Sequence, residues 1–165
     1  MRHLTLIRHA KSSWDDAVLS DFKRPLNPRG KMNAPLMGKL FKTRGVTFDI
    51  IMSSPAVRAS TTAELIAREI AYPARQIEYL DALYGAGNST LLELVQNLPD
   101  AAQRVALVAH NPGLTEFCNA LCNAGIGNLP SCAIAAIRFD VETWQAVCRG
   151  SGTLQSYEYP RRHTD

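Results

Sequence analysis

An apolar run from Leu4 to Ile7 ends abruptly in an arginine and a histidine, Arg8 and His9. A second arginine, Arg58, and a second histidine, His110, stand in the same kind of position, shortly after an apolar, strand-like stretch. Two guanidinium groups and two imidazoles gathered at the ends of strands could hold a phosphoryl group and attack its phosphorus. This chemistry calls for no metal ion and no cofactor.

Each of these four residues has a specific role in such a reaction. A neutral imidazole is nucleophilic, but the ordinary pKa of histidine is only about 6.5, and an approaching phosphate raises it. Two nearby arginines oppose that rise and bind phosphoryl oxygens through charge-assisted, often bidentate hydrogen bonds. We therefore predict that His9 is the nucleophile and forms a phosphohistidine that water hydrolyses, with Arg8, Arg58 and His110 completing the phosphate pocket.

Three segments share one order of elements: a buried strand, a polar turn and a helix. They contain Arg8-His9, Ser53-Ser54 and His110-Asn111. In open α/β sheets, ligands bind at the carboxyl ends of strands, close to helix N-termini. We therefore expect these side chains to face one crevice, with Ser53 and Asn111 as additional phosphate-binding candidates.

Strand-like and helix-like segments alternate along the chain, which predicts a single α/β domain, a three-layer α/β/α sandwich around a mostly parallel sheet. The predicted strands are 4–7, 48–52, 105–109, 134–139 and 144–148, with a short edge strand at 76–79. The predicted helices are 56–71, 89–98, 114–123 and 31–43, of which the last begins near Asn33 or kinks at Pro35. Pro55 should occupy the first position of its helix, Gly45 should end the 31–43 helix, and residues from about 160 to 165 should form a disordered tail.

The composition excludes several classes of protein. The 165 residues carry 18 Lys and Arg against 15 Asp and Glu, a net charge of +3, and the basic residues are spread along the sequence without a stripe that would suit nucleic acid. No apolar run is long enough for a signal peptide core or a membrane span. The four cysteines show no metal-type pairing, so we expect reduced thiols in a cytoplasmic protein.

Cys132 and Arg138 offer a competing nucleophilic site, since five residues separate them as in cysteine-dependent phosphatases. That chemistry needs a loop whose backbone amides converge on one phosphate, commonly with glycines. The intervening residues, 133–137, are all Ala or Ile and are typical of a buried strand. We therefore favour the histidine site.

These motifs together resemble the histidine phosphatase superfamily (phosphoglycerate mutase-like). Its Arg-His-Gly hallmark reads Arg8-His9-Ala10 here, and the segments 53–59 with 62–63 and 108–114 are similar to its second and third motifs. Lys11-Ser12-Ser13-Trp14 and the run 21–30 resemble the small SixA-type phosphohistidine phosphatases. The resemblance covers residues 4 to about 139 and implies that His9 is the phosphorylated nucleophile, in a pocket of Arg8, Arg58 and His110.

The resemblance also raises the question of the general acid. Many superfamily members carry a glutamate four residues before the glycine of an aromatic-glycine motif, and Asp81 occupies that position before Gly85. Asp81 is therefore a candidate acid or a structural carboxylate.

Three functions remain open at this point. The first is a phosphatase for phosphohistidine on a signalling or phosphotransfer protein, whose imidazole leaving group needs little acid assistance. The second is a general phosphomonoesterase for small metabolites, with Asp81 as the acid. The third is a non-catalytic phosphate-binding interaction module. The expected partner is thus a phosphorylated protein or small molecule, and neither nucleic acid nor membrane.

Overall fold

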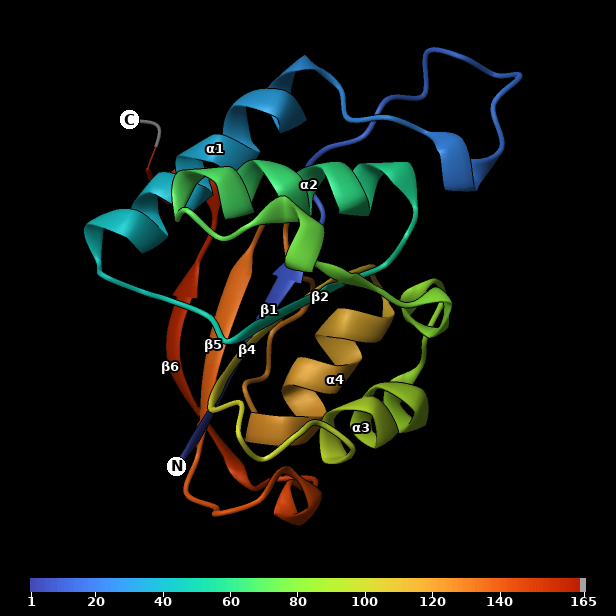
Figure 1. The fold of residues 1–165 in the computed structure, drawn as a ribbon. Helices are drawn as coiled ribbons and strands as arrows, with labels where there is room; N and C mark the ends of the chain where they lie inside the picture. Colours follow the sequence, from blue (N-terminus) through green and yellow to red (C-terminus); the bar gives the residue numbers. More distant parts are fainter. Residues whose placement is uncertain (164–165) are drawn as a thin grey trace.

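The computed structural model describes residues 1–163 and contains one six-stranded sheet, shown in Figure 1. The strands are β1 (Arg2–Arg8), β2 (Ile50–Ser53), β3 (Glu78–Tyr79), β4 (Arg104–Ala109), β5 (Ile134–Phe139) and β6 (Gly152–Glu158). Their order across the sheet is β3-β2-β4-β1-β5-β6. The first four strands run parallel, whereas β5 pairs antiparallel with both β1 and β6. The predicted α/β domain with a mostly parallel sheet is confirmed.

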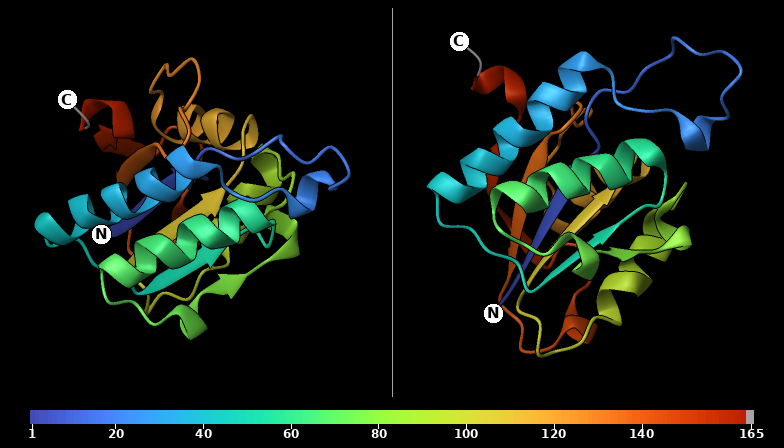
Figure 2. Two further views of the ribbon diagram at one scale, coloured as in Figure 1. Left: turned by 90° about the horizontal axis from the view of Figure 1, so that it is seen from above. Right: turned by 45° about the horizontal axis from the view of Figure 1, so that its top comes forward.

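Four helices cover the two faces of the sheet. Helices α1 (Pro28–Thr43) and α2 (Val57–Glu69) lie together on one face, and α3 (Asn88–Gln96) and α4 (Gly113–Cys122) lie on the other, as both views of Figure 2 show. Alternate residues of the central strands pack into two separate hydrophobic cores, one on each face of the sheet. Leu107 packs in the core beneath α3 and α4, whereas Val108 packs in the core beneath α1 and α2. This alternation, with both faces apolar, is the physical origin of the three layers. Within residues 1–163, no helix combines the length and hydropathy that crossing a bilayer requires.

The register of the sheet aligns the ends of three strands. Arg8 at the end of β1 pairs with Ala109 at the end of β4, and Ser53 at the end of β2 pairs with Val108. Because these strands are parallel, the residues that follow them emerge at the same edge of the sheet. His9 and His110 are among them.

Helix α1 is longer than its sequence predicts. It begins at Pro28, not near Asn33, and the Asn27 side chain caps it by accepting a 2.8 Å hydrogen bond from the backbone N–H of Gly30. Asparagine followed by proline is a favourable start, since proline at the first position sacrifices no hydrogen bond. Pro35 lies inside the helix. The predicted end is confirmed: Gly45 follows the C-cap residue and has a φ of 68°, which glycine adopts without strain.

Two further predictions were wrong. Pro55 does not open α2, which begins at Val57 with Ala56 as its N-cap. The predicted strand 144–148 is a 3-10 turn, because the fully buried Trp144 donates its indole N–H to the Ala102 carbonyl (2.7 Å) and so closes one end of the core. The last strand, β6, lies later and alternates half-buried with exposed residues, a weaker pattern.

The predicted disordered tail is wrong for residues 160–163. Residues Pro160–Arg162 form a 3-10 turn (η5) in which Pro160 is buried, and the His163 ring contacts the Glu158 carboxylate at 2.6 Å. The final two positions of the predicted tail, 164 and 165, lie outside the described residues.

Candidate active site

His9 lies at the end of β1 and is held by its backbone on both sides. Its N–H donates to the Ala109 carbonyl (3.2 Å), and its own carbonyl accepts from the N–H of Cys132 (3.0 Å). The side chain is 8% exposed, and Nδ1 lies 2.7 Å from the Ala10 carbonyl oxygen. A carbonyl can only accept, so Nδ1 carries the ring hydrogen and Nε2 keeps its lone pair. The turn thereby leaves Nε2 as the ring nitrogen with an available lone pair.

His110 lies beside His9, with 5.1 Å between the ring centroids. Its Nε2 is 2.7 Å from the hydroxyl oxygen of Ser54, which also accepts a hydrogen bond from the Ala56 N–H (3.2 Å). The other ring nitrogen, Nδ1, is buried and has no hydrogen-bond partner among the described residues. A buried polar atom without a partner is uncommon and is often associated with a ligand-binding role.

Arg58 comes to the two imidazoles from the first turn of α2. It is 6% exposed, and both of its terminal nitrogens donate to Asp21, one to the backbone carbonyl (2.6 Å) and one to carboxylate Oδ2 (2.9 Å). Arg8 donates from Nη1 to the Leu129 carbonyl (2.7 Å), while its buried Nε has no partner within residues 1–163. The charges of both arginines act on both histidine rings. The structure therefore brings together the four residues on which the sequence analysis depended.

Thr62 joins the turn after β1 to helix α2. Its hydroxyl accepts a hydrogen bond from the Ala10 N–H (2.9 Å) and donates to the Arg58 carbonyl (2.7 Å). Both Ala10 and Thr62 are fully buried. One hydroxyl thus sets the position of the turn that follows His9 relative to the helix that carries Arg58.

Asp21 is the site residue that sequence reasoning missed. Besides Arg58, its carboxylate accepts hydrogen bonds from the Tyr84 hydroxyl (2.6 Å) and from Arg24 (2.9 Å). Tyr84 in turn packs edge-on against the His110 ring, with centroids 5.5 Å apart. Asp21 lies in a 3-10 turn (η1, Asp21–Lys23) far from any strand end, so neither periodicity nor the strand-end rule signals it. Its inclusion in the SixA-like run 21–30 was the available hint.

Ser53 and Asn111, the two additional phosphate-binding candidates, both make hydrogen bonds inside the protein. Ser53 is fully buried, and its hydroxyl donates to the carbonyl of Ser54, so it is the next serine that reaches His110. Asn111 uses its amide inside the protein: Nδ2 donates to the Leu129 carbonyl (3.0 Å), and Oδ1 accepts from Thr115 (2.8 Å). A polar residue beside a strand end is able to satisfy local backbone groups, and phosphate binding by these two residues stays a prediction.

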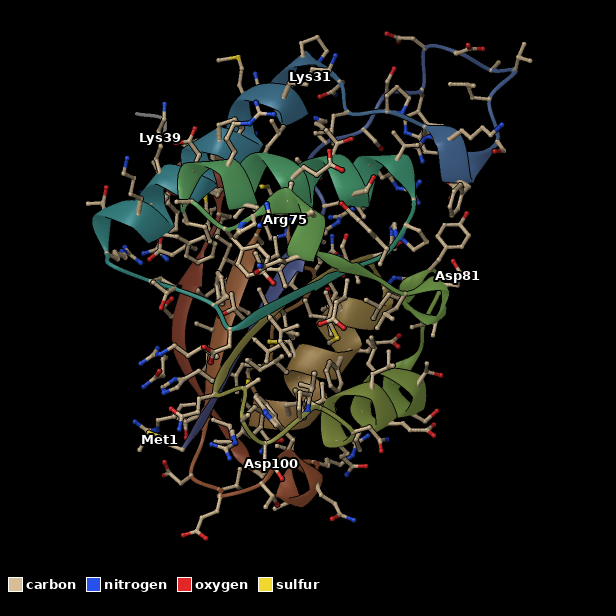
Figure 3. All side chains as sticks on the ribbon, in the orientation of Figure 1. Met1, Lys31, Lys39, Arg75, Asp81 and Asp100 are labelled. Carbon is tan, nitrogen blue, oxygen red and sulfur yellow. The ribbon has the colours of Figure 1, made fainter. Side chains whose placement is uncertain are left out.

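Asp81, the predicted acid, lies in the 3-10 turn η3 (Asp81–Leu83), and Figure 3 labels it beside the loop that precedes α3. It is exposed, and its carboxylate makes no hydrogen bond or ion pair within the described residues. The same turn contributes to the site through Tyr84, which binds Asp21. Asp21, and not Asp81, is therefore the carboxylate that contacts the arginine of the site.

Burial and positive charge keep both imidazoles neutral. Loss of hydration is the largest cause that lowers the pKa of His9, to about 3, and the charges of His110, Arg58 and Arg8 lower it further. The pKa of His110 falls to about 4, again mainly through burial and then through Arg58. Hydrogen bonds from Tyr84 and then from Arg24 and Arg58 hold the pKa of Asp21 well below its usual range. At neutral pH the site therefore contains two neutral imidazoles and an ionised carboxylate.

These shifts predict how stability depends on pH. In the unfolded chain both histidines protonate near pH ~6.5, whereas in the folded protein they stay neutral down to about pH 4 and 3. Over that interval the unfolded state binds more protons, so the free energy of unfolding should fall as pH drops below about 6.5. Urea unfolding at pH 7, 6 and 5 measures this slope. A His9→Asn/His110→Asn double variant should show a shallower slope, and identical slopes would contradict the buried neutral state.

The competing cysteine site is absent. Cys132 is fully buried, burial raises the pKa of its thiol to about 12, and the residues that follow it form β5 as predicted. A thiolate is therefore not accessible there. Within residues 1–163, no three His, Cys, Asp or Glu side chains are grouped so that they could hold a metal ion.

Known proteins share both the sequence and the fold of this chain. Residues 4–85 match the histidine phosphatase superfamily (branch 1), a stretch that includes Arg8, His9 and Arg58. An uncharacterised protein of Mycobacterium tuberculosis (strain H37Rv) is 30% identical over 165 residues, which span 94% of this chain and 100% of the relative. The SixA protein of Agrobacterium tumefaciens is 26% identical and superposes with a TM-score of 0.83, covering 96% of this chain and 98% of that one.

The chain belongs to the histidine phosphatase superfamily. It resembles the SixA type, as the match to the Agrobacterium tumefaciens protein indicates. The protein histidine phosphatase SixA bound to tungstate shares its fold, with a TM-score of 0.78 at 24% identity over 97% of this chain and 98% of that one. An uncharacterised chloroplast protein of Arabidopsis thaliana is 28% identical over 160 residues, 92% of this chain and 72% of the relative. Membership of this superfamily supports phosphatase activity for the site at the ends of β1 and β4.

Proposed function

We propose that this histidine phosphatase removes the phosphoryl group from phosphohistidine side chains of a signalling or phosphotransfer protein, without a metal ion. The observation that carries the proposal is the pairing of a neutral nucleophile with an ionised carboxylate. His9 offers a free Nε2 beside His110, while Asp21 is held deprotonated by its partners. Such a site can attack phosphorus strongly but has little means of protonating a leaving group.

The proposed reaction has two steps. In the first, His9 Nε2 attacks the phosphorus of a phosphohistidine whose ring has taken up a proton from solvent. The substrate's P–N bond breaks, and the imidazole departs as a neutral ring that keeps the electron pair of that bond. Arg8, Arg58 and the Nδ1–H of His110 stabilise the charge on the phosphoryl oxygens, with Ser54 orienting the His110 ring. In the second, water attacks phospho-His9, the new P–N bond breaks and returns its electron pair to Nε2, and inorganic phosphate leaves as the proton of the attacking water passes to solvent.

The state of Asp21 favours phosphohistidine over phosphate esters. An alkoxide leaving group needs a general acid whose pKa lies near the working pH, and the pKa of Asp21 lies far below it. An imidazole leaving group accepts a proton readily and needs less assistance. The family likeness to SixA, described as a protein histidine phosphatase, supports the same substrate class. The four free cysteines support a reducing, cytoplasmic compartment.

The alternative is a phosphomonoesterase of small metabolites with Asp81 as its acid. The exposed position of Asp81 leaves it available to a bound substrate, so mutation distinguishes the two functions. Loss of a true general acid costs about 10²–10⁴-fold in rate. We expect Asp81→Asn to change turnover of a phosphohistidine protein by less than about threefold, far below that range.

The experiment compares wild-type protein and Asp81→Asn on a phosphohistidine protein and on p-nitrophenyl phosphate, with and without a chelator. Asp140→Asn, an exposed carboxylate beyond the opposite end of β1, is the matched control. Wild-type protein should prefer the phosphohistidine donor and should keep its rate in the chelator. Faster hydrolysis of the ester, abolished by Asp81→Asn, would establish the phosphomonoesterase instead. Phosphate binding without turnover of either donor would identify a non-catalytic module.

A further inference from the structure

A cationic groove of about 520 Å³ lies between the N-terminal half of α1, the loop before β5 and the C-terminal turn η5. The residues that matter for its chemistry are three cations and two aromatic rings. These are Lys11, Arg29, Arg161, Tyr157 and Tyr159. Among the described residues 1–163, no acidic residue lines it.

The three cations lack partners within residues 1–163. All three are exposed, and neither the ion pairs nor the side-chain hydrogen bonds of that part of the chain involve them. Lys11 and Arg29 are 18 residues apart in the sequence, and Arg29 and Arg161 are 132 residues apart. Basic residues that are spread along the sequence therefore form a local positive patch in the folded protein. Unpaired cations around a concave surface favour an anionic partner.

The walls of the groove are held in place by backbone contacts. The Lys11 carbonyl accepts a hydrogen bond from the Asn27 N–H (2.9 Å). The same carbonyl oxygen packs against Gly30, where the Cβ of any other residue would lie only 2.2 Å from it. On the other side, Arg162 donates to the Tyr157 carbonyl (2.8 Å), which folds η5 back toward β6 and places its neighbour Arg161 at the groove. The groove is therefore a formed surface.

The groove adjoins the phosphoryl site. Lys11 is two residues beyond His9, and Ser131, another lining residue, precedes the Cys132 whose N–H binds the His9 carbonyl. A phosphorylated side chain that reached His9 would leave the rest of its protein beside these cations.

We propose that this groove binds an acidic segment of the phosphorylated protein, next to the phosphohistidine that enters the active site. The proposal rests on the proposed function and names the surface that selects its partner. Carboxylates of the segment would approach Lys11, Arg29 and Arg161, while apolar atoms would pack on the two tyrosine rings. Exposed charges of this kind act mainly on the association rate and lose their effect as salt increases.

The test is the double variant Arg29→Glu/Arg161→Glu, which leaves Lys11 and the active site intact. The protein donor is an acidic histidine phosphotransfer domain, phosphorylated on its histidine with phosphoramidate, and the small donor is free phosphohistidine. For the protein donor, kcat/KM at low salt should fall about tenfold or more, and its dependence on salt should weaken. For the small donor, kcat/KM should stay within about twofold, since screened surface charges matter little to a small ligand at His9.

Lys39→Glu/Arg75→Glu is the matched control, since it makes the same change of net charge at exposed positions that do not line the groove. Lys39 lies on α1 and Arg75 in the 3-10 turn η2 (Ala74–Gln76), and Figure 3 labels both. It should reduce kcat/KM for the protein donor much less than the groove variant does. An equal loss in the control, or an equal loss on both donors, would overturn the docking proposal.

The outcomes also separate this proposal from the proposed function. If the wild type turns over the protein donor and the groove variant does so at the same rate, the docking proposal is overturned, whereas the proposed phosphohistidine phosphatase activity is retained. Failure of the wild type on both phosphohistidine donors would overturn the function itself. Binding of an RNA oligonucleotide that the groove variant abolishes, with no effect on the protein donor, would assign the groove to nucleic acid and overturn the proposal.

Discussion

His9→Asn should reduce turnover of a phosphohistidine donor by on the order of 10⁴-fold or more, the scale expected when a covalent nucleophile is removed. Asparagine is the informative replacement because its Nδ2–H can still donate to the Ala10 carbonyl, as His9 Nδ1–H does. What it lacks is Nε2, the atom that would attack phosphorus. Rapid quenching of wild-type protein with a labelled donor should trap acid-labile phosphate on His9, and the variant should trap none.

His3→Asn is the matched control, because His3 belongs to the same strand but lies at the opposite end of β1 from the site. It should keep nearly full activity. Circular dichroism should show that both variants are folded. Label retained in His9→Asn, or recovered from another residue of the wild type, would refute His9 as the nucleophile.

Arg58 should rank second in its effect on catalysis. Removing one preorganised donor to a developing oxyanion typically costs about 10²–10³-fold in rate, and we expect this loss from Arg58→Ala. Arg58→Lys keeps the charge but loses the two-pronged geometry that suits phosphate, so it should still lose about tenfold or more. Steady-state kcat and KM on free phosphohistidine measure both losses without any contribution from the groove.

Arg68→Lys tests whether the effect belongs to the site, since Arg68 is exposed in the last turn of the same helix. Its activity should match the wild type. Thermal unfolding of the Arg58 variants should also be recorded, because the side chain anchors Asp21 as well as facing the imidazoles. Full activity of Arg58→Lys would show that a single positive charge is sufficient for catalysis, and it would contradict bidentate phosphate binding by Arg58.

The fold was predictable wherever neighbouring residues carry the signal. Strand β5 was predicted at its observed bounds, since a run such as 134–139 is too apolar to lie anywhere but in the core. The ends of helices and the later strands were harder. Trp144 appears strand-forming by residue type, yet its place depends on the Ala102 carbonyl, a contact that no local pattern encodes.

The same division applies to the site. His9, Arg8, Arg58 and His110 could be predicted to meet because parallel strands send their carboxyl ends to one edge of the sheet, whatever the loops between them do. For Ser53 and Asn111 the sequence could not show their hydrogen bonds inside the protein, because strand ends also need polar groups for the backbone.

Sequence alone therefore determined the class of fold, the pair of imidazoles and the arginines, since these follow from local periodicity and from the geometry of a parallel sheet. Tertiary structure decided that Asp21 reaches Arg58 from a distant turn, that Asp81 stays at the surface, and that Lys11, Arg29 and Arg161 share one groove. These contacts join segments whose relative positions depend on how turns and helix ends pack across the whole chain. That packing is a property of many weak contacts acting together and has no period in the sequence.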